Sequence, residues 1–393
     1  MNSYIEKEKE YIFQTYKRYP ISIEKGIGCR LYDFEGNSYL DFLGGIAVNA
    51  LGHSHPKVLK ALHEQMEKYL HISNYFYQEP QIKLAEKLTQ MSPYDKVFFS
   101  NSGTEATEAA LKLARLWGNK YSKSKVISFT NAFHGRSYGA LSLMDKALYK
   151  ENMGPFLQDI NIIAYNNIEA IRANINNDTS AVILEFIQGE GGIVGVSEDF
   201  VKELFELRDK LGFIIIADEI QSGAGRTGKL FAFEHYGVKP DIITMAKGIG
   251  GGLPLGGVLT TNQIATLFGY GTHGTTYGGN ALACAAGLVV LEELEAGLLH
   301  QVTENGNYLK SELIQIKELF PNHISEVRGI GFLQGLSLSF EASELVVELR
   351  NHKIIGNATS GNVLRIIPPL IVTKLEIDEF ITALKQSIDI IKK

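Results

Sequence analysis

The fold of this chain is most constrained by a series of short, wholly apolar segments that alternate with helical patterns. The segments are apolar throughout rather than at every second residue, as expected for strands of a parallel sheet covered by helices on both faces. Residues 104–117 and 198–211 show the helical periodicity between them. This alternation predicts an α/β fold with a mostly parallel, doubly wound central sheet. The predicted strands are residues 97–100, 126–130, 181–186, 213–217, 242–245 and 257–261.

The chain changes character near residue 297, which predicts a division into a large and a small domain. Residues 48–296 form the predicted large domain. Shorter predicted strands at 330–338 and 363–367 lie between amphipathic helices, which favours a small α+β domain over residues 297–393. The N-terminal residues 1–47 are expected to pack with the small domain. Within them, residues 29–33 and 38–41 flank a Glu-Gly-Asn turn and predict a hairpin.

Composition excludes several classes of partner. A formal net charge of −6 argues against nucleic acid, because a phosphate backbone requires a basic face. Cys29 and Cys284 are far apart and have no metal-ligand spacing. We find no apolar core of a signal peptide at the N-terminus and no apolar run long enough to cross a bilayer. We therefore expect a cytoplasmic protein that binds no metal, nucleic acid or membrane.

Polar residues at the ends of the predicted strands are the first candidates for a site, because ligands of α/β sheets bind at the carboxyl ends of strands. Residues 100–106 lead from a strand into a strong helical pattern. Gly103 permits close approach of the backbone, and the free N–H groups near Thr104 could bind a phosphate. The alternative is an ordinary N-cap, with Glu105 favouring the start of the helix.

Two charged residues directly follow apolar strands. Asp218 could hold the protonated nitrogen of a heteroaromatic ring, ligate a metal or cap a helix. Lys247 precedes a glycine-rich stretch, residues 248–252. Desolvation would lower the pKa of its amine, which suits Schiff-base formation, whereas the alternative is a solvated loop lysine. The glycines do not favour a dinucleotide fingerprint, because no clear helix opens after them.

An aromatic residue and two arginines complete the candidates. Phe133 and Arg136, in a Phe-His-Gly-Arg sequence, suggest a stacked planar ring and a bound carboxylate. Arg365 is a second anion-binding candidate, although either arginine could instead form a structural ion pair. A helix start for phosphate, a strand-end Asp, a strand-end Lys and a stacking ring are together the parts that pyridoxal 5′-phosphate (PLP) requires.

Ordered motifs over nearly the whole chain resemble the class III (ornithine-type) aminotransferases of the fold-type I PLP enzymes, and within them the branch that acts on N-acetylornithine. The resemblance implies a PLP-binding α/β fold and a homodimer with shared active sites. The motifs are residues 44–53, 73–77, 102–106, 133–136, 188–192, 218–223, 246–248 and 273–280.

The resemblance also implies how the coenzyme is held. Lys247 would be the Schiff-base lysine and would carry the proton between the substrate carbon and the coenzyme. Asp218 would pair with the pyridine nitrogen, Gln221 would face the phenolic oxygen, and Thr276 would reach the phosphate from the neighbouring subunit. The further residues implied to contact the coenzyme are Gly103, Thr104, Phe133, Glu219 and Ile220.

The substrates would be held by the two arginines. The resemblance implies that Arg136, with Thr275 nearby, binds the carboxylate of an acylated ornithine. Arg365 would bind the α-carboxylate of glutamate or 2-oxoglutarate, and Glu190 would neutralise Arg365 while the amino donor occupies the site. Two departures leave substrate preference open: Phe186 stands where the family usually has proline, and Thr107 where it often has asparagine.

The reaction favoured by the resemblance is transfer of an amino group from N2-acetyl-L-ornithine to 2-oxoglutarate, which gives N-acetyl-L-glutamate 5-semialdehyde and L-glutamate in arginine biosynthesis. Succinylornithine, ornithine and 4-aminobutyrate are alternative donors. Ornithine is disfavoured because no tyrosine stands near Gly45 and Ile46. Arg365 speaks against glutamate-1-semialdehyde aminomutase, which needs no oxoacid site. The intact Lys247 and Asp218 speak against a non-catalytic relative.

Overall fold

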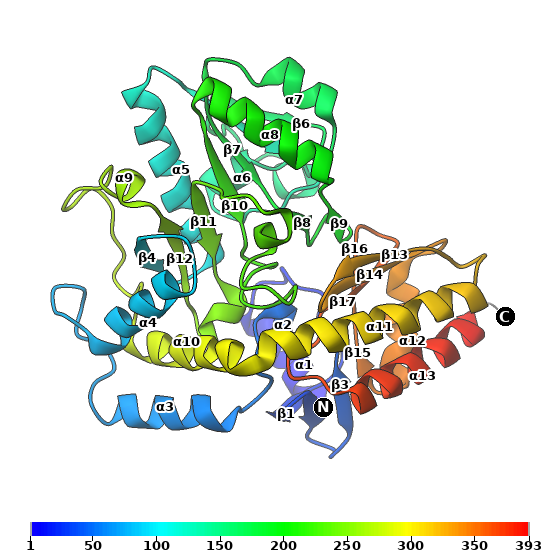
Figure 1. The fold of residues 1–393 in the computed structure, drawn as a ribbon. Helices are drawn as coiled ribbons and strands as arrows, with labels where there is room; N and C mark the ends of the chain where they lie inside the picture. The colour runs from blue at the N-terminus through cyan, green and yellow to red at the C-terminus, as the bar shows by residue number, and fades with distance from the viewer. Residues whose placement is uncertain (1, 392–393) are drawn as a thin grey trace.

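The computed structural model describes residues 2–391 and is centred on a seven-stranded sheet with the strand order β4-β12-β11-β10-β7-β5-β6 (Figure 1). Neighbouring strands are parallel except for β12, which is antiparallel to both β4 and β11. The carboxyl ends of β4, β5, β7, β10 and β11 therefore lie at one edge of the sheet. The strands are β4 (Lys96–Ser100), β5 (Lys125–Phe129), β6 (Ile160–Ile163), β7 (Thr179–Leu184), β10 (Ile214–Asp218), β11 (Ile242–Met245) and β12 (Gly256–Thr260).

The six strands predicted from the apolar runs are all present, displaced by no more than two residues. The fold class is thereby confirmed. Strand β6 was not predicted, because Ile160–Ile163 is short and Asn161 interrupts its apolar character. It pairs in parallel with β5 at the edge of the sheet.

Helices cover both faces of this sheet, as the uninterrupted apolar strands predict. Ile214 and Ile216 of β10 pack on the face that holds α5 (Gly103–Lys120), whereas Ile215 and Ala217 face the core that includes α8 (Glu198–Leu211) and α10 (Ala281–Glu293). Helix α5 begins at Ser102, whose side chain accepts a hydrogen bond from the backbone N–H of Glu105 at 3.3 Å. This cap fixes where the helix starts and hence where its free N–H groups lie.

A second, four-stranded antiparallel sheet has the order β13-β14-β17-β16. The strand predicted over residues 330–338 is present as β14 (Leu333–Leu338), but its start is wrong, because a turn separates it from the preceding strand of a hairpin, β13 (Ile324–Ile330). The turn uses Gly331 at a φ of 59°, where a Cβ atom would approach the carbonyl oxygen of Arg226 to 2.6 Å. The apolar pattern continues through this turn and hides it. Strand β17 (Val363–Ile366) confirms the other predicted strand, and β16 is Asn357–Thr359.

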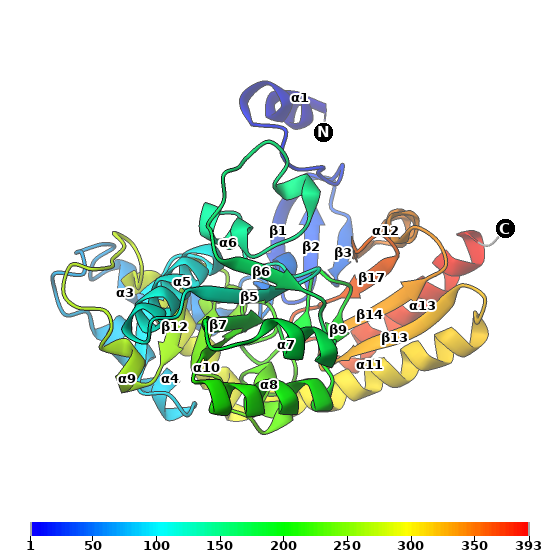
Figure 2. The same ribbon diagram turned by 90° about the horizontal axis from the view of Figure 1, so that it is seen from above.

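The N-terminal residues form a third sheet, β1-β2-β3-β15, which joins distant parts of the chain (Figure 2). The predicted hairpin is present as β2 (Arg30–Asp33) and β3 (Ser38–Asp41). The Asp33 carboxylate closes its turn by accepting the N–H groups of Glu35 and Asn37 at 3.0 and 2.8 Å. Strand β3 pairs in parallel with β15 (Ile354–Ile355), while β1 (Ile23–Ile27) lies at the edge.

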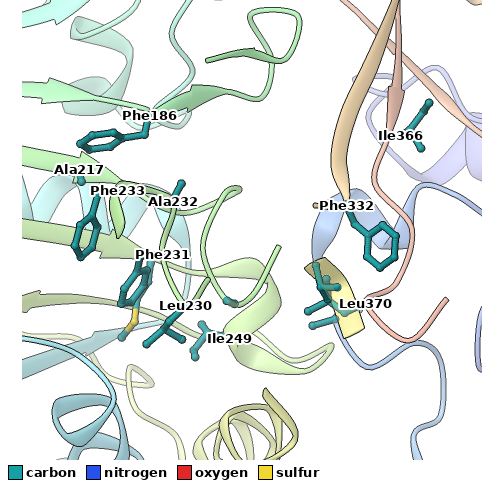
Figure 3. Close-up of a cluster of buried hydrophobic side chains, with 14 of the residues drawn as sticks. Phe186, Ala217, Leu230, Phe231, Ala232, Phe233, Ile249, Phe332, Ile366 and Leu370 are labelled. Carbon is teal, nitrogen blue, oxygen red and sulfur yellow. The ribbon is translucent and has the colours of Figure 1, made fainter. Parts of the chain in front are cut away.

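A long helical path connects the seven-stranded sheet to the sheet β13-β14-β17-β16, seen in Figure 1 as α10 followed by α11 (Leu299–Leu319). The π-helical turn Leu294–Leu298 lies between them, with Gly297 at a φ of 128°. The kink falls at the boundary expected between residues 296 and 297, and the division into domains stays a prediction. Figure 3 shows apolar side chains between the sheets: Phe231 and Ile249 on the side of the large sheet, and Phe332, Ile366 and Leu370 on the other.

After β3 the chain makes an unusual left-handed turn, Gly44–Ala47. All of its residues have φ between 55° and 63°, including Ile46 and Ala47. The remaining elements are α1 (Asn2–Tyr11), α3 (Pro56–Met66), α4 (Glu79–Gln90), α6 (Tyr138–Ser142), η1 (Ala147–Tyr149), α7 (Ile168–Asn174), β8 (Ile187–Gln188), β9 (Val194–Gly195), η2 (Ala232–Tyr236), η3 (Lys247–Gly250), α9 (Asn262–Ala265), α12 (Ala342–Asn351) and α13 (Lys374–Ile391). Of the helices within residues 2–391, none has the length and apolar character needed to span a membrane.

Candidate active site

The strand ends of the large sheet open onto a cavity of about 480 Å³. Residues that follow five different strands, β4, β5, β7, β10 and β11, line it, and the first and last of these strand ends are more than a hundred positions apart in the chain. Among residues 2–391 no group of His, Cys, Asp or Glu is arranged to hold a metal ion. The predicted site residues that line the cavity are Gly103, Thr104, Phe133, Arg136, Glu190, Asp218, Ile220, Gln221 and Lys247.

Lys247 lies on the floor of this cavity, two residues after β11. Its backbone has a φ of 51°, an uncommon conformation for a residue other than glycine. Its amine makes no hydrogen bond to any residue that the structure describes. Burial lowers the pKa of this amine to about 8, even though the negative charge of Glu190 acts in the opposite direction. About a tenth of the amine is thus neutral at pH 7, far more than for an ordinary lysine, and this form is able to attack a carbonyl.

Asp218 ends β10 and is almost completely buried. One carboxylate oxygen accepts the N–H of Ile220 at 3.1 Å, and the other lies 2.6 Å from Nδ1 of His134. Burial alone would lower the pKa of His134, but the hydrogen bond to Asp218 and the nearby negative charges outweigh it and raise the pKa. His134 therefore fixes the position of the Asp218 side chain, which can pair with a protonated ring nitrogen.

Glu185 follows β7 and fastens two loops of the cavity together. Its carboxylate accepts the N–H of Phe133 at 2.9 Å and the N–H of Gly189 at 3.0 Å. Burial raises the pKa of this carboxyl to about 7. The loop that carries the aromatic ring of Phe133 and the loop that leads to Glu190 are thereby fixed relative to each other.

The start of α5 forms the polar end of the cavity. The backbone N–H groups of Gly103 and Thr104 belong to the first turn of an 18-residue helix, where the helix dipole favours an anion. Gly103 is required here, because a Cβ atom would lie 2.8 Å from the Ile220 side chain. The Thr104 hydroxyl is 2.8 Å from that of Ser137 and also accepts the Ser137 N–H at 3.2 Å. When the Ser137 hydroxyl is the donor of this pair, the Thr104 hydroxyl hydrogen is free for a phosphate oxygen.

Four predicted residues do not line the cavity within this chain: Glu219, Thr275, Thr276 and Arg365. The Glu219 side chain accepts hydrogen bonds from the N–H groups of Ala232 and Phe233 at 3.0 and 2.9 Å, so it braces a neighbouring loop. Thr275 interacts with Asn101 at 3.0 Å, next to the start of α5. Thr276 is exposed on the same loop.

Arg365, on β17, is buried behind the cavity and held by three side chains. It donates a short hydrogen bond to Glu190, and it donates to Gln221 at 3.2 Å and to Asn357 at 2.5 Å. Burial would raise the pKa of Glu190, but the charge of Arg365 outweighs burial and lowers it. Nε of Arg365 is buried and has no hydrogen-bond partner among residues 2–391. The arginine is thus charge-neutralised, yet retains a free donor.

Arg136 is placed differently. It is exposed to solvent, and its guanidinium carbon lies 5.6 Å from the centre of the Phe133 ring. No hydrogen bond or ion pair links it to any other residue of the described chain. A free guanidinium at the rim of the cavity is suited to bind a carboxylate bidentately.

His134 and Glu185 are the two buried polar residues of the site to which the sequence assigned no role. His134 is adjacent to Phe133 in the chain, but its contact with Asp218 spans 84 positions. Its backbone carbonyl accepts the hydroxyl of buried Thr107 at 2.9 Å, so Thr107 supports the same network. Phe186 is buried against Tyr236, with ring centres 5.1 Å apart, and its side chain is away from the cavity.

This chain belongs to the class-III aminotransferase family, whose model matches residues 11–388. Its members are PLP enzymes, and the chain is accordingly a PLP-dependent aminotransferase. The acetylornithine aminotransferase of Methanocaldococcus jannaschii is 44% identical, with 100% of this chain and 99% of that protein aligned.

Solved structures agree with this assignment. The ornithine aminotransferase of Toxoplasma gondii has a TM-score of 0.95 at 32% identity and covers 100% of this chain and 95% of its own. The acetylornithine aminotransferase of Elizabethkingia anophelis has a TM-score of 0.88 at 33% identity, with 98% of both chains covered. The cavity fits the coenzyme of the family, because it presents a partly neutral lysine, a buried carboxylate, an aromatic ring and an anion-binding helix start.

Proposed function

We propose that this chain transfers the δ-amino group of N2-acetyl-L-ornithine to 2-oxoglutarate, giving N-acetyl-L-glutamate 5-semialdehyde and L-glutamate, a step of arginine biosynthesis in the cytoplasm. The observation that supports this most is a pair of arginines beside one cavity: Arg136 lines it, and Arg365 lies behind it, hydrogen-bonded to the lining residues Glu190 and Gln221. The relatives named acetylornithine aminotransferase over their full length agree with it.

The coenzyme and the residues around it divide the chemistry. PLP, when bound, supplies a ring that accepts the electrons released as the C–H bond of the substrate breaks. Asp218 keeps a proton on the ring nitrogen, which makes the ring a better electron acceptor. His134 holds the Asp218 carboxylate in place at 2.6 Å. Lys247, whose amine is partly neutral near pH 7, would take the proton from the reacting carbon of the substrate and pass it to the coenzyme.

The two half-reactions differ in which arginine is used. Acetylornithine reacts at its δ-carbon, so its only carboxylate is distant from the reacting centre and binds Arg136. During this half-reaction Glu190 stays on Arg365 and keeps a buried positive charge compensated. Glutamate and 2-oxoglutarate react next to a carboxylate, and that carboxylate displaces Glu190 from Arg365. One cavity thus accepts two substrates of different shape.

We propose further that the active unit is a homodimer. Thr276 is exposed and lies outside the cavity of its own chain, so a second copy is needed for it to contact the phosphate. Large aromatic side chains are exposed on the segment that carries a family motif: Tyr75 is 94% exposed and Tyr77 is 97% exposed. Burial of such side chains against a second copy removes apolar surface from water.

A half-reaction experiment tests the proposed function. Purified protein with PLP bound is mixed separately with acetylornithine, succinylornithine, ornithine and 4-aminobutyrate, and the visible absorption of the coenzyme is followed. We expect rapid loss of absorption with acetylornithine and recovery when 2-oxoglutarate is added. The Asp218→Asn variant serves as a control, because it should bind the same substrates but react far more slowly. Conversion by ornithine or 4-aminobutyrate alone would overturn the proposed donor.

A further inference from the structure

Arg136 owes its position to aromatic rings rather than to hydrogen bonds. Its guanidinium carbon lies 3.6 Å from the centre of the Tyr149 ring, which is direct stacking. Phe133 is more distant, at 5.6 Å, and its ring meets that of Tyr149 edge-on, with centres 6.1 Å apart at 86°. Because no described side chain donates to or accepts from Arg136, the Tyr149 ring is its nearest support.

This support has a chemical advantage for binding an anion. A ring stacked on the flat face of a guanidinium attracts its charge without using the N–H donors, which lie in the plane. An acidic partner would hold Arg136 equally firmly but would occupy those donors. The donors therefore remain available for the two oxygens of a carboxylate.

Tyr149 itself is held independently of Arg136. It is the last residue of η1, in the segment between α6 and β6. The segment is fastened by Lys150, whose amine donates to the carbonyl of Met144 at 2.8 Å, and by the N–H of Leu157, which donates to Ser142 at 3.0 Å. The backbone that carries Tyr149 is thus held without Arg136, and the Tyr149 ring is the platform on which the more exposed arginine rests.

The charges around this platform also favour an anion. The amine of Lys146 lies 4.8 Å from the centre of the same Tyr149 ring, which adds a second positive charge. The nearby Asp145 carboxylate is engaged elsewhere, as it accepts the N–H of Asn131 at 3.1 Å.

We propose that Tyr149 is the positioning residue for Arg136 and thereby sets the affinity for the distal carboxylate of the amino donor. The proposal rests on the function proposed above for the donor. It assigns no contact between Tyr149 and the substrate, and no part in proton transfer. Substitution of Tyr149 should therefore change substrate binding far more than the rate at saturation.

The test measures the apparent Kd of acetylornithine and the saturating rate in the half-reaction for Tyr149→Leu, Tyr149→Phe, Arg136→Ala and the double variant Arg136→Ala/Tyr149→Leu. We expect Tyr149→Leu to raise Kd about tenfold, equal to about 1.4 kcal/mol, with a nearly unchanged saturating rate. Tyr149→Phe keeps the ring and should stay within about threefold of the wild type. The double variant should bind no more weakly than Arg136→Ala alone, because the ring acts through the arginine.

Two controls separate positioning from general disturbance. Leu148→Ala alters an exposed neighbour in η1 and should leave Kd unchanged. A donor without a carboxylate, 1-aminopentane, should bind Tyr149→Leu and wild-type protein equally. The proposal would be overturned if Tyr149→Leu weakened acetylornithine binding by the same factor with and without Arg136. It would also be overturned if Tyr149→Phe weakened binding as much as Tyr149→Leu does.

A crystal structure of Tyr149→Leu decides the question without depending on the donor. The Arg136 guanidinium should leave its position beside Phe133, while the backbone of η1 stays in place. An unmoved Arg136 would refute the positioning role, whatever substrate the enzyme accepts. Failure of the wild type to react with acetylornithine would instead defeat the proposed function and leave this structural comparison to decide the role of Tyr149.

Discussion

Arg365 and Arg136 serve one cavity but are built in opposite ways. Arg365 is 3% exposed and is surrounded by a carboxylate and two amide oxygens. Arg136 is exposed, rests on aromatic rings and has no acidic partner in the described chain. A buried guanidinium without a counterion costs several kcal/mol, whereas an exposed one remains solvated.

The difference shows how one site can bind two carboxylates at different times. Because Arg365 is already paired with Glu190, a substrate carboxylate must displace Glu190 to bind. The net binding free energy is then only the difference between the interaction of Arg365 with the substrate and its interaction with Glu190. Arg136 has no competitor and binds any carboxylate that reaches it. Arg365 thus binds a substrate carboxylate only when Glu190 is displaced, whereas Arg136 is always available to bind one.

The largest expected effect comes from removing the amine of Lys247, which takes part in both half-reactions. Lys247→Ala should abolish the visible absorption of the lysine-bound coenzyme and lower turnover by a factor on the order of 10³ or more, as expected for loss of a proton-transfer group. Absorption spectra and steady-state rates with acetylornithine measure this. Thermal unfolding of the variant serves as the control for folding. Normal turnover would show that another residue carries the proton.

Replacement of the buried arginine should affect one half-reaction selectively. Arg365→Ala should raise KM for 2-oxoglutarate about 100-fold, about 2.7 kcal/mol, because charge-assisted hydrogen bonds are lost. The acetylornithine half-reaction should change much less. Arg136→Ala is the matched comparison, and it should weaken acetylornithine binding. If both variants weakened both substrates equally, the contrast between the two arginines would be wrong.

Glu190→Gln sharpens the comparison by removing the anion from Arg365. With no carboxylate to displace, glutamate should bind about tenfold more tightly, about 1.4 kcal/mol. The Kd of glutamate in the half-reaction measures this gain, and Arg136→Ala in the same assay shows whether the gain is specific to Arg365. A lower affinity for glutamate would mean that Glu190 assists this substrate instead of competing with it.

The smallest effect concerns the pKa of Lys247, about 8 in the folded protein. Only the neutral amine captures the coenzyme, so the rate of PLP uptake by the apoprotein should rise with pH through about 8 and level off above it. Glu190 raises the pKa of Lys247, so Glu190→Gln should move this midpoint to lower pH, whereas Arg136→Ala should leave it in place. Stopped-flow absorption from pH 6.5 to 9.5, as an approximate range, measures the midpoint. A midpoint near that of ordinary lysine would contradict the effect of burial.

The sequence predicts the large sheet and its strand ends well because uninterrupted apolar runs are a strong local signal. Asp218 and Lys247 follow such runs directly, so the edge of the sheet where they meet could be predicted. The hairpin at Gly331 could not, since its turn lies inside a continuous apolar stretch. The direction of a side chain at a strand end is also set by tertiary contacts, and for this reason Glu219 faces Ala232 and Phe233 instead of the cavity.

Contacts between loops were the least predictable part of the site. The sequence separates His134 from Asp218 by 84 positions, and only the packing of β5 and β10 on either side of β7 brings them together. Arg136 and Tyr149 are closer in the chain, but their stacking depends on how the segment after α6 folds back. Local sequence patterns therefore predict neither the contact of His134 with Asp218 nor that of Arg136 with Tyr149.

The left-handed turn Gly44–Ala47 packs directly against the segment that follows β17. A Cβ atom at Gly44 would lie 2.9 Å from the carbonyl oxygen of Ile367, so only glycine allows the turn to sit against the end of the Arg365 strand. The turn continues into Val48, which forms part of the cavity wall. Backbone hydrogen bonds from Ile367 to Phe42 and from Leu370 to Ala50 clamp it on both sides. The strand that carries Arg365 and the cavity wall at Val48 are therefore joined by one short segment with backbone hydrogen bonds at both ends, so any side chain placed at Gly44 would disturb both.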